Sequence, residues 1–70
     1  MAAANFANKV VTQAQLTAQK ANLVGANFSN ATVTNLNFNG FNLTNANFTG
    51  AKLSGAVLTN ANLTGANLTG

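Results

Sequence analysis

Large apolar residues recur at every fifth position along residues 21–70. This stretch divides without a break into ten units, ANLVG, ANFSN, ATVTN, LNFNG, FNLTN, ANFTG, AKLSG, AVLTN, ANLTG and ANLTG. The third position is always Leu, Phe or Val, and the fifth is always Gly or Asn. A period of five fits neither the 3.6 residues of an α-helix nor the alternation of a long strand. Each unit is therefore predicted to be a short extended segment followed by a turn.

The first and third positions of a unit share one side of an extended segment, because they lie two residues apart. The first position is Ala in eight of the ten units, the exceptions being Leu36 and Phe41. We therefore expect the first and third residues to point inward and the second to point outward. Gly or Asn at the fifth position suits the unusual backbone of a turn. Each unit then forms one side of a tube.

The unit Ala-Asn-Leu-Thr-Gly resembles the consensus of the pentapeptide-repeat family, with a small first residue, Asp or Asn second, and Leu or Phe third. The resemblance covers fifty of the seventy residues. It implies an all-β solenoid, specifically a right-handed quadrilateral β-helix with four units per coil. The ten units would then make about two and a half coils. This sequence differs from the consensus in that its second position is never acidic.

With four units per coil, residues twenty apart should stack at about the 4.8 Å spacing of neighbouring strands. The large residues at positions 36 and 41 would face small alanines above and below them, so we interpret both as local packing compensation. We expect the outward amides to hydrogen-bond along the tube, as stacked amides do in cross-β structures. The predicted core ladder is Leu23, Phe28, Val33, Phe38, Leu43, Phe48, Leu53, Leu58, Leu63 and Leu68. The predicted outward ladder is Asn22, Asn27, Asn42, Asn47, Asn62 and Asn67.

Residues 1–20 precede the repeats, and we expect them to form an amphipathic helix or cap that packs on the solenoid of residues 21–70. Their Ala, Gln and Lys content favours helix. At helical spacing, the following residues share one side: Ala3, Phe6, Ala7, Val10, Ala14, Thr17, Ala18 and Ala21. This side is mostly alanine, so packing on the solenoid is favoured over binding to a membrane.

A degenerate first coil is the alternative for the same residues. The five-residue frame can be continued back through Phe6, Val11 and Leu16. It would point Lys9 inward and leave Gln19 and Lys20 as a two-residue insertion, so the helix is the preferred interpretation.

The composition argues against an enzyme. The chain has no Cys, His, Asp or Glu, which removes the usual metal ligands and general acids and bases, so we expect no catalytic, cofactor or metal site. The charge of +3 comes from three scattered residues, Lys9, Lys20 and Lys52, and phosphate binding normally needs clustered cations. We therefore expect no nucleic-acid partner. No signal peptide or membrane-spanning stretch is visible, and the sequence indicates no compartment.

A coil end exposes unpaired strand edges and apolar core, and solenoids normally cap such ends. We expect a structural protein that associates with itself through its solenoid ends, and we favour a head-to-tail filament over an end-to-end dimer. The residues predicted at the self-association end are Ala61, Leu63, Ala66 and Leu68. The resemblance implies an alternative, a DNA mimic that binds type II topoisomerases, but that role requires an acidic surface. A further alternative is an ice- or glycan-binding surface made of the Thr and Asn ladders.

Overall fold

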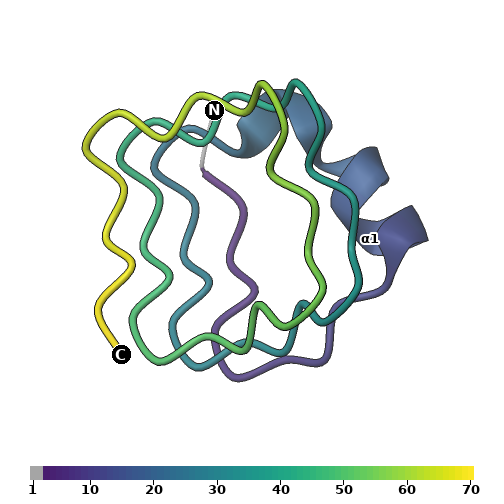
Figure 1. The fold of residues 1–70 in the computed structure, drawn as a ribbon, viewed down its shortest axis with the longest axis vertical. Helices are drawn as coiled ribbons and strands as arrows, with labels where there is room; N and C mark the ends of the chain where they lie inside the picture. Colours follow the sequence, from purple (N-terminus) through teal and green to yellow (C-terminus); the bar gives the residue numbers. More distant parts are fainter. Residues whose placement is uncertain (1–2) are drawn as a thin grey trace.

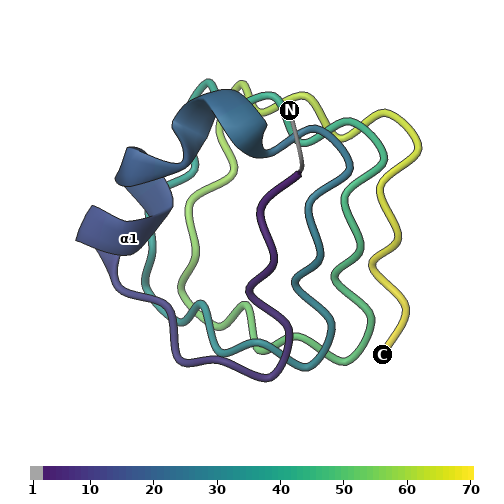
Figure 2. The ribbon, with the colours of Figure 1, turned by 180° about the vertical axis from the view of Figure 1, so that it is seen from behind.

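The computed structural model describes residues 3–70, which wind into a stack of four-sided coils (Figure 1). Parallel β-bridges join residues twenty apart, such as Asn27 to Asn47, Asn37 to Val57 and Asn42 to Asn62. Four five-residue units therefore make one coil. Each side contributes a single bridge rather than a long strand, because the backbone turns after every unit. The view from behind shows the same nested coils (Figure 2), and the β-solenoid expected from the repeats is confirmed.

Four kinds of backbone hydrogen bond hold the units together. The fifth residue donates to the fourth residue of the next coil, at 2.8 Å from Asn30 N. The third residue donates to the second residue of the next coil, as from Phe28 N to Asn47 O at 2.7 Å. That second residue donates back to the first, as from Asn47 N to Ala26 O at 2.9 Å. Each turn is closed inside the chain, as from Ala31 N to Phe28 O at 2.9 Å. The fifth residue has positive φ throughout, 58° at Asn30 for example, which explains why only Gly and Asn occur there.

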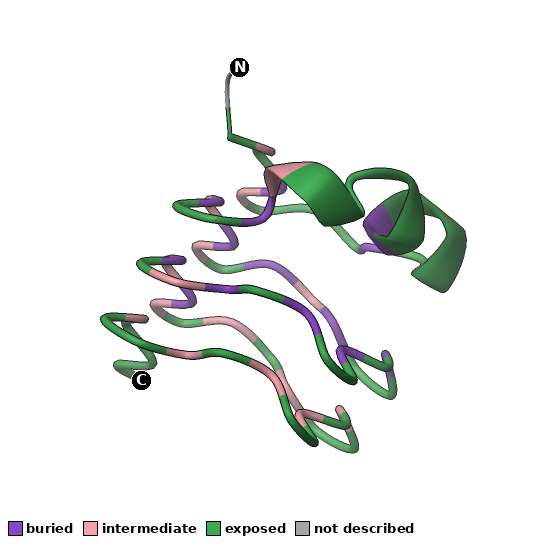
Figure 3. Cartoon of the chain, turned by 90° about the horizontal axis from the view of Figure 1, so that it is seen from above, coloured by how far each residue is buried: buried purple, intermediate pink, exposed green. Residues whose placement is uncertain are grey.

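The core is a column of third-position side chains. The rings of Phe6, Phe28 and Phe48 stack above one another, with centroids 5.2 and 4.6 Å apart. Phe38 packs edge-on against this column, 6.1 Å from Phe28. Burial decreases towards the C-terminus (Figure 3). The fully or almost fully buried members of the predicted ladder are Leu23, Phe28, Val33, Phe38, Leu43 and Phe48.

The predicted helix over residues 1–20 is wrong for residues 3–12, while residues 1–2 lie outside the described part of the chain. Bridges join Asn5 to Asn27 and Val10 to Thr32, so the solenoid already includes residues 4–12. Phe6 and Val11 are buried in its core. For residues 4–12 the structure shows the degenerate first coil, whereas residues 13–18 are helical. Lys9 is not driven inward as that frame implied, because its side chain lies exposed at the rim of the top coil.

Helix α1 spans only Gln13–Ala18, and a 3₁₀ turn, η1, spans Lys20–Asn22. The helix begins at a capping box in which Thr12 and Gln15 each accept a hydrogen bond from the other's backbone N–H. Leu16 is its buried residue, whereas the predicted apolar side with Ala14 and Ala18 is exposed. A helix advances about 1.5 Å per residue against about 3.3 Å for a strand, so it absorbs the two extra residues of this coil.

The two large first-position residues lie in the coil next to α1 and η1. Leu36 and Phe41 are both buried and belong to the same core cluster as Leu16. The Lys20 ammonium lies 5.4 Å from the centre of the Phe41 ring. These side chains therefore pack where the neighbouring coil is helical rather than extended.

Within residues 3–70, the structure contains no helix with the length and apolar character needed to cross a membrane.

Candidate functional site

The C-terminal coil, residues 51–70, forms one open end of the tube (Figure 3). Ala61, Leu63 and Ala66 are only half-buried there, and Leu68 is 47% exposed. Leu43 and Phe48 occupy the equivalent places one coil earlier and are buried. The structure thus brings the four residues of the predicted self-association end together on one surface. Leu53 and Leu58 are half-buried on the remaining two sides.

The same end carries backbone groups that have partners in every earlier coil. Phe48 N donates to Asn67 O at 2.7 Å, and Ala46 O accepts from Asn67 N at 2.9 Å. The corresponding groups one coil later are the N–H of Leu68 and the carbonyl of Ala66, which bond to none of the described residues. An unpaired strand edge of this kind is a template for another chain.

The outward asparagines stack as predicted but do not bond to one another. Bridges align Asn27, Asn47 and Asn67, and likewise Asn42 and Asn62. Their Oδ1 atoms accept hydrogen bonds from the residue two positions later in the same unit. The expectation that these amides hydrogen-bond along the tube is therefore wrong, because the local backbone N–H already occupies the acceptor.

Asn22 departs from the other five members of the predicted ladder. It lies in η1, and its Nδ2 donates to Gln19 Oε1 at 3.1 Å. On this side the regular outer face therefore begins only at Asn42, whereas Asn5 in the first coil already bridges Asn27 and accepts from Ala7 N.

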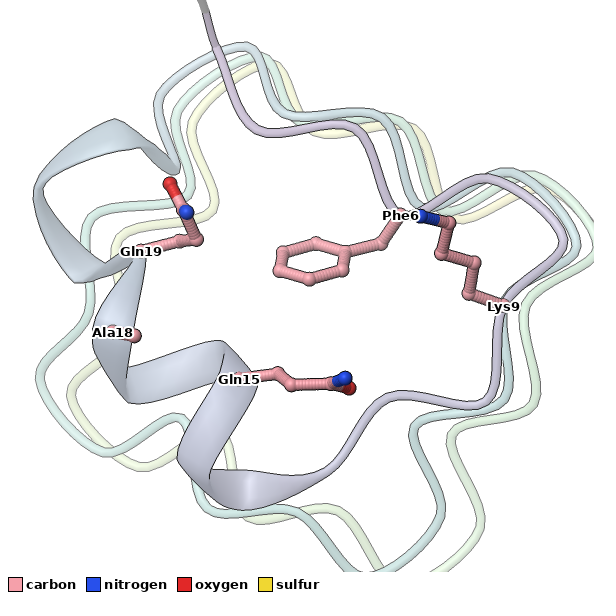
Figure 4. A pocket seen from close by; sticks show the side chains of 5 residues that line it. All are labelled: Phe6, Lys9, Gln15, Ala18 and Gln19. Atoms are coloured by element: carbon pink, nitrogen blue, oxygen red, sulfur yellow. The ribbon is translucent and has the colours of Figure 1, made fainter.

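A pocket of about 230 Å³ opens at the opposite, N-terminal mouth of the tube. The Phe6 ring points into the middle of the coil, with α1 along one flank and Lys9 at the rim (Figure 4). Gln15, Ala18 and Gln19 line the helical flank. Sequence reasoning missed this site. The signal that could have found it was the five-residue frame through Phe6, which places that ring at the top of the phenylalanine column.

Comparisons with known proteins agree with this architecture. A family model described as Pentapeptide repeats matches residues 14–50 and 42–70, with eight copies. The crystal structure of HetL, a pentapeptide repeat protein involved in heterocyst differentiation regulation in the cyanobacterium Nostoc, is similar, with a TM-score of 0.62 and 35% sequence identity. The match covers 89% of this chain and 24% of HetL, so the chain spans about a quarter of that protein. No curated protein matches the chain.

Proposed function

Because the chain belongs to the pentapeptide-repeat family, we propose that it acts without catalysis, as a structural module that binds a second copy of itself through residues 51–70. The observation that carries this proposal is the open coil edge, where unpaired backbone groups and half-buried leucines lie side by side. As part of this proposal the coil is right-handed, which the resemblance to the family implies.

The backbone pattern of the edge supports a two-fold dimer. Each side offers the carbonyl of its first residue and the N–H groups of its third and fifth, as at Ala66, Leu68 and Gly70. The first two of these groups are the ones that a two-fold contact would pair. In an antiparallel pair, two residues that face each other without hydrogen bonds are flanked by reciprocal N–H to C=O bonds. When two copies meet edge to edge about a two-fold axis, their facing sides run antiparallel. The first-residue carbonyl of one copy then meets the third-residue N–H of the other, and the reverse. Such an isologous contact closes on itself.

The head-to-tail filament expected from the repeats remains the second arrangement. It needs the unpaired backbone edge at the N-terminal end of the next copy. There the Gln13 side chain already forms hydrogen bonds with the backbone groups of Asn37. The Gln13 amide donates to Asn37 O at 3.0 Å and accepts from Asn37 N at 2.7 Å. An α-helix is also about 10 Å across, roughly twice the separation of two coils. A continuous tube would therefore require α1 to move, whereas the dimer would not.

The experiment is sedimentation velocity combined with negative-stain microscopy over a range of protein concentrations. Leu68→Lys places a charge in the edge, and Val10→Lys is the matched control, because Val10 is 76% exposed on the outer side of the first coil. We expect a concentration-dependent dimer for the original chain and for Val10→Lys, and a monomer for Leu68→Lys. A strictly monomeric original chain at high concentration would exclude self-association, and fibres would favour the head-to-tail arrangement.

The other functions considered from the sequence gain no support. A DNA mimic needs an acidic surface, and the chain contains no Asp or Glu. An ice- or glycan-binding face would use free hydroxyl groups, but Thr44, Thr49, Thr64 and Thr69 all donate their hydroxyl protons to asparagine oxygens in their own units.

A further inference from the structure

We propose that the pocket at the N-terminal mouth binds a small aromatic carboxylate, with its ring on Phe6 and its carboxylate at Lys9. This site lies at the opposite end of the tube from the coil edge of residues 51–70, so the proposal does not depend on self-association.

The floor of the pocket is the last ring of an aromatic column. Phe6 stacks on Phe28 with an interplanar angle of 22°, and Phe28 stacks on Phe48 at 4°. One side of Phe6 is therefore covered by the column, and its remaining 8% exposure faces the pocket. A planar ring placed there would become the next member of the column, and aromatic pairs of this kind are favourable beyond the area that they bury.

The polar groups around this floor are hydrogen-bond donors. Gln15 Oε1 already accepts from Thr12 N at 3.0 Å, and Gln19 Oε1 accepts from Asn22 Nδ2 at 3.1 Å. The Nε2 groups of both glutamines have no acceptor among the described residues, and Lys9 adds an ammonium at the rim (Figure 4). The chain has no Asp or Glu to neutralise that lysine. Three donors and one positive charge select an anionic acceptor such as a carboxylate.

The dimensions of the pocket limit the ligand to a single ring. At about 230 Å³, it is smaller than the roughly 300–1,000 Å³ of pockets that hold drug-sized molecules. Ala18 and the C-cap residue Gln19 follow Gln15 by three and four positions, so all three lie on one side of α1 and its C-terminal end. The small Ala18 side chain between the two amides leaves room for the ring.

The test is an NMR titration of the 70-residue chain at neutral pH with three probes: benzoate, its uncharged analogue benzamide, and acetate, which has no ring. We expect saturable shifts with benzoate, centred on Phe6, Lys9, Gln15 and Gln19. Benzamide and acetate should each bind at least about tenfold more weakly than benzoate, because each lacks one of the two contacts. Equal binding of benzoate and acetate, or benzoate shifts away from these residues, would overturn the proposal.

Two lysine variants separate the pocket from general attraction to a cationic protein. Lys9→Met removes the charge at the rim and keeps a stem of similar length, and Lys52→Met removes an exposed charge from the outer side of the last coil. We expect at least a tenfold loss of benzoate affinity for Lys9→Met, and none for Lys52→Met. The same loss of affinity in both variants would refute the site. Dilution of the chain without ligand is the second check, because shifts of the same pocket residues would mean that a second copy of the chain occupies the pocket.

Discussion

At the scale of single residues, the turns show a constraint that links one coil to the next. An Asn at the fifth position leans over the fifth residue of the following coil. The Oδ1 atoms of Asn30, Asn35 and Asn45 take up the space that a Cβ would need at the residue twenty positions later, which is Gly in each case. At these three positions Gly is therefore set by a packing rule and not only by positive φ, whereas the corner that contains Asn8 and Asn30 stacks Asn on Asn.

Gly55→Ala should destabilise the chain more than Gly40→Ala. Both glycines have φ near +70°, so both variants incur the left-handed penalty of about 1–2 kcal/mol. Only Gly55 lies beneath an Asn oxygen, that of Asn35, whereas a Cβ at Gly40 would meet nothing within 4 Å. We expect Gly55→Ala to cost up to about 1 kcal/mol more, because the exposed Asn35 amide must rotate away from the new methyl group.

Urea denaturation of both variants measures this difference. Asn35→Gly should restore most of the additional loss in the Gly55→Ala background, because it removes the overlapping side chain. Equal losses in the two single variants would contradict the packing rule.

The Oδ1 atoms of the outward asparagines accept hydrogen bonds from their own units. We therefore expect Asp, which keeps this oxygen, to preserve stability at these positions, and Ala to reduce it. Asn47 Oδ1 accepts from Thr49 N at 2.9 Å and from Thr49 Oγ1 at 2.6 Å. Asn47→Ala removes both bonds and should cost about 1–2 kcal/mol, at roughly 0.5–1.5 kcal/mol per bond. Asn47→Asp keeps both acceptors and should leave the melting temperature nearly unchanged.

Asn39→Ala is the control for this prediction, because the Asn39 side chain makes no hydrogen bond with the described residues. A similar loss for Asn39→Ala and Asn47→Ala would mean that the turn oxygen contributes nothing specific.

At the scale of elements, the repeat period was enough to predict the solenoid, its register and its core, but not the start of the first coil. Helix propensities among ordinary residues differ by at most about 0.7 kcal/mol. Burying a Phe or Val contributes about 1.5–3 kcal/mol, so Phe6 and Val11 enter the core although their neighbours favour helix. Where the frame gains two residues, at Gln19 and Lys20, extended backbone no longer fits and α1 forms. The pocket was not predicted because it depends on where α1 lies relative to Phe6.

The side chain of Gln13, the first residue of α1, takes the place of a neighbouring strand, so its loss should uncover the edge of the next coil. Its amide makes both of the hydrogen bonds with Asn37 that a neighbouring strand would make. In Gln13→Ala, the amide hydrogen of Asn37 should exchange much faster, by about tenfold or more if one net bond of about 1.4 kcal/mol is lost.

Val33 provides an internal reference for that measurement. Its N–H donates to Lys52 O at 2.9 Å on the neighbouring side, away from α1, and its exchange should not change. Acceleration at both residues would indicate general loosening of the solenoid rather than loss of a specific contact.

At the scale of the whole molecule, burial falls from the middle coils to the C-terminal end, and the proposed dimer would restore it. Leu43 and Leu63 occupy the same position on the same side, but Leu43 is fully buried and Leu63 is half-buried. Truncating a buried Leu to Ala costs about 2–5 kcal/mol. In a dilute sample, Leu63→Ala should therefore lose less unfolding free energy than Leu43→Ala.

The two truncations should also respond differently to protein concentration. A partner that binds only the folded chain stabilises it by mass action, so the original chain and Leu43→Ala should both gain stability with concentration. Leu63→Ala weakens the contact surface itself and should gain much less, so its difference from the original chain should widen as concentration rises. Thermal unfolding at concentrations about a hundredfold apart measures this difference. A constant difference would place Leu63 outside any interface between copies and would leave the coil edge without its proposed partner.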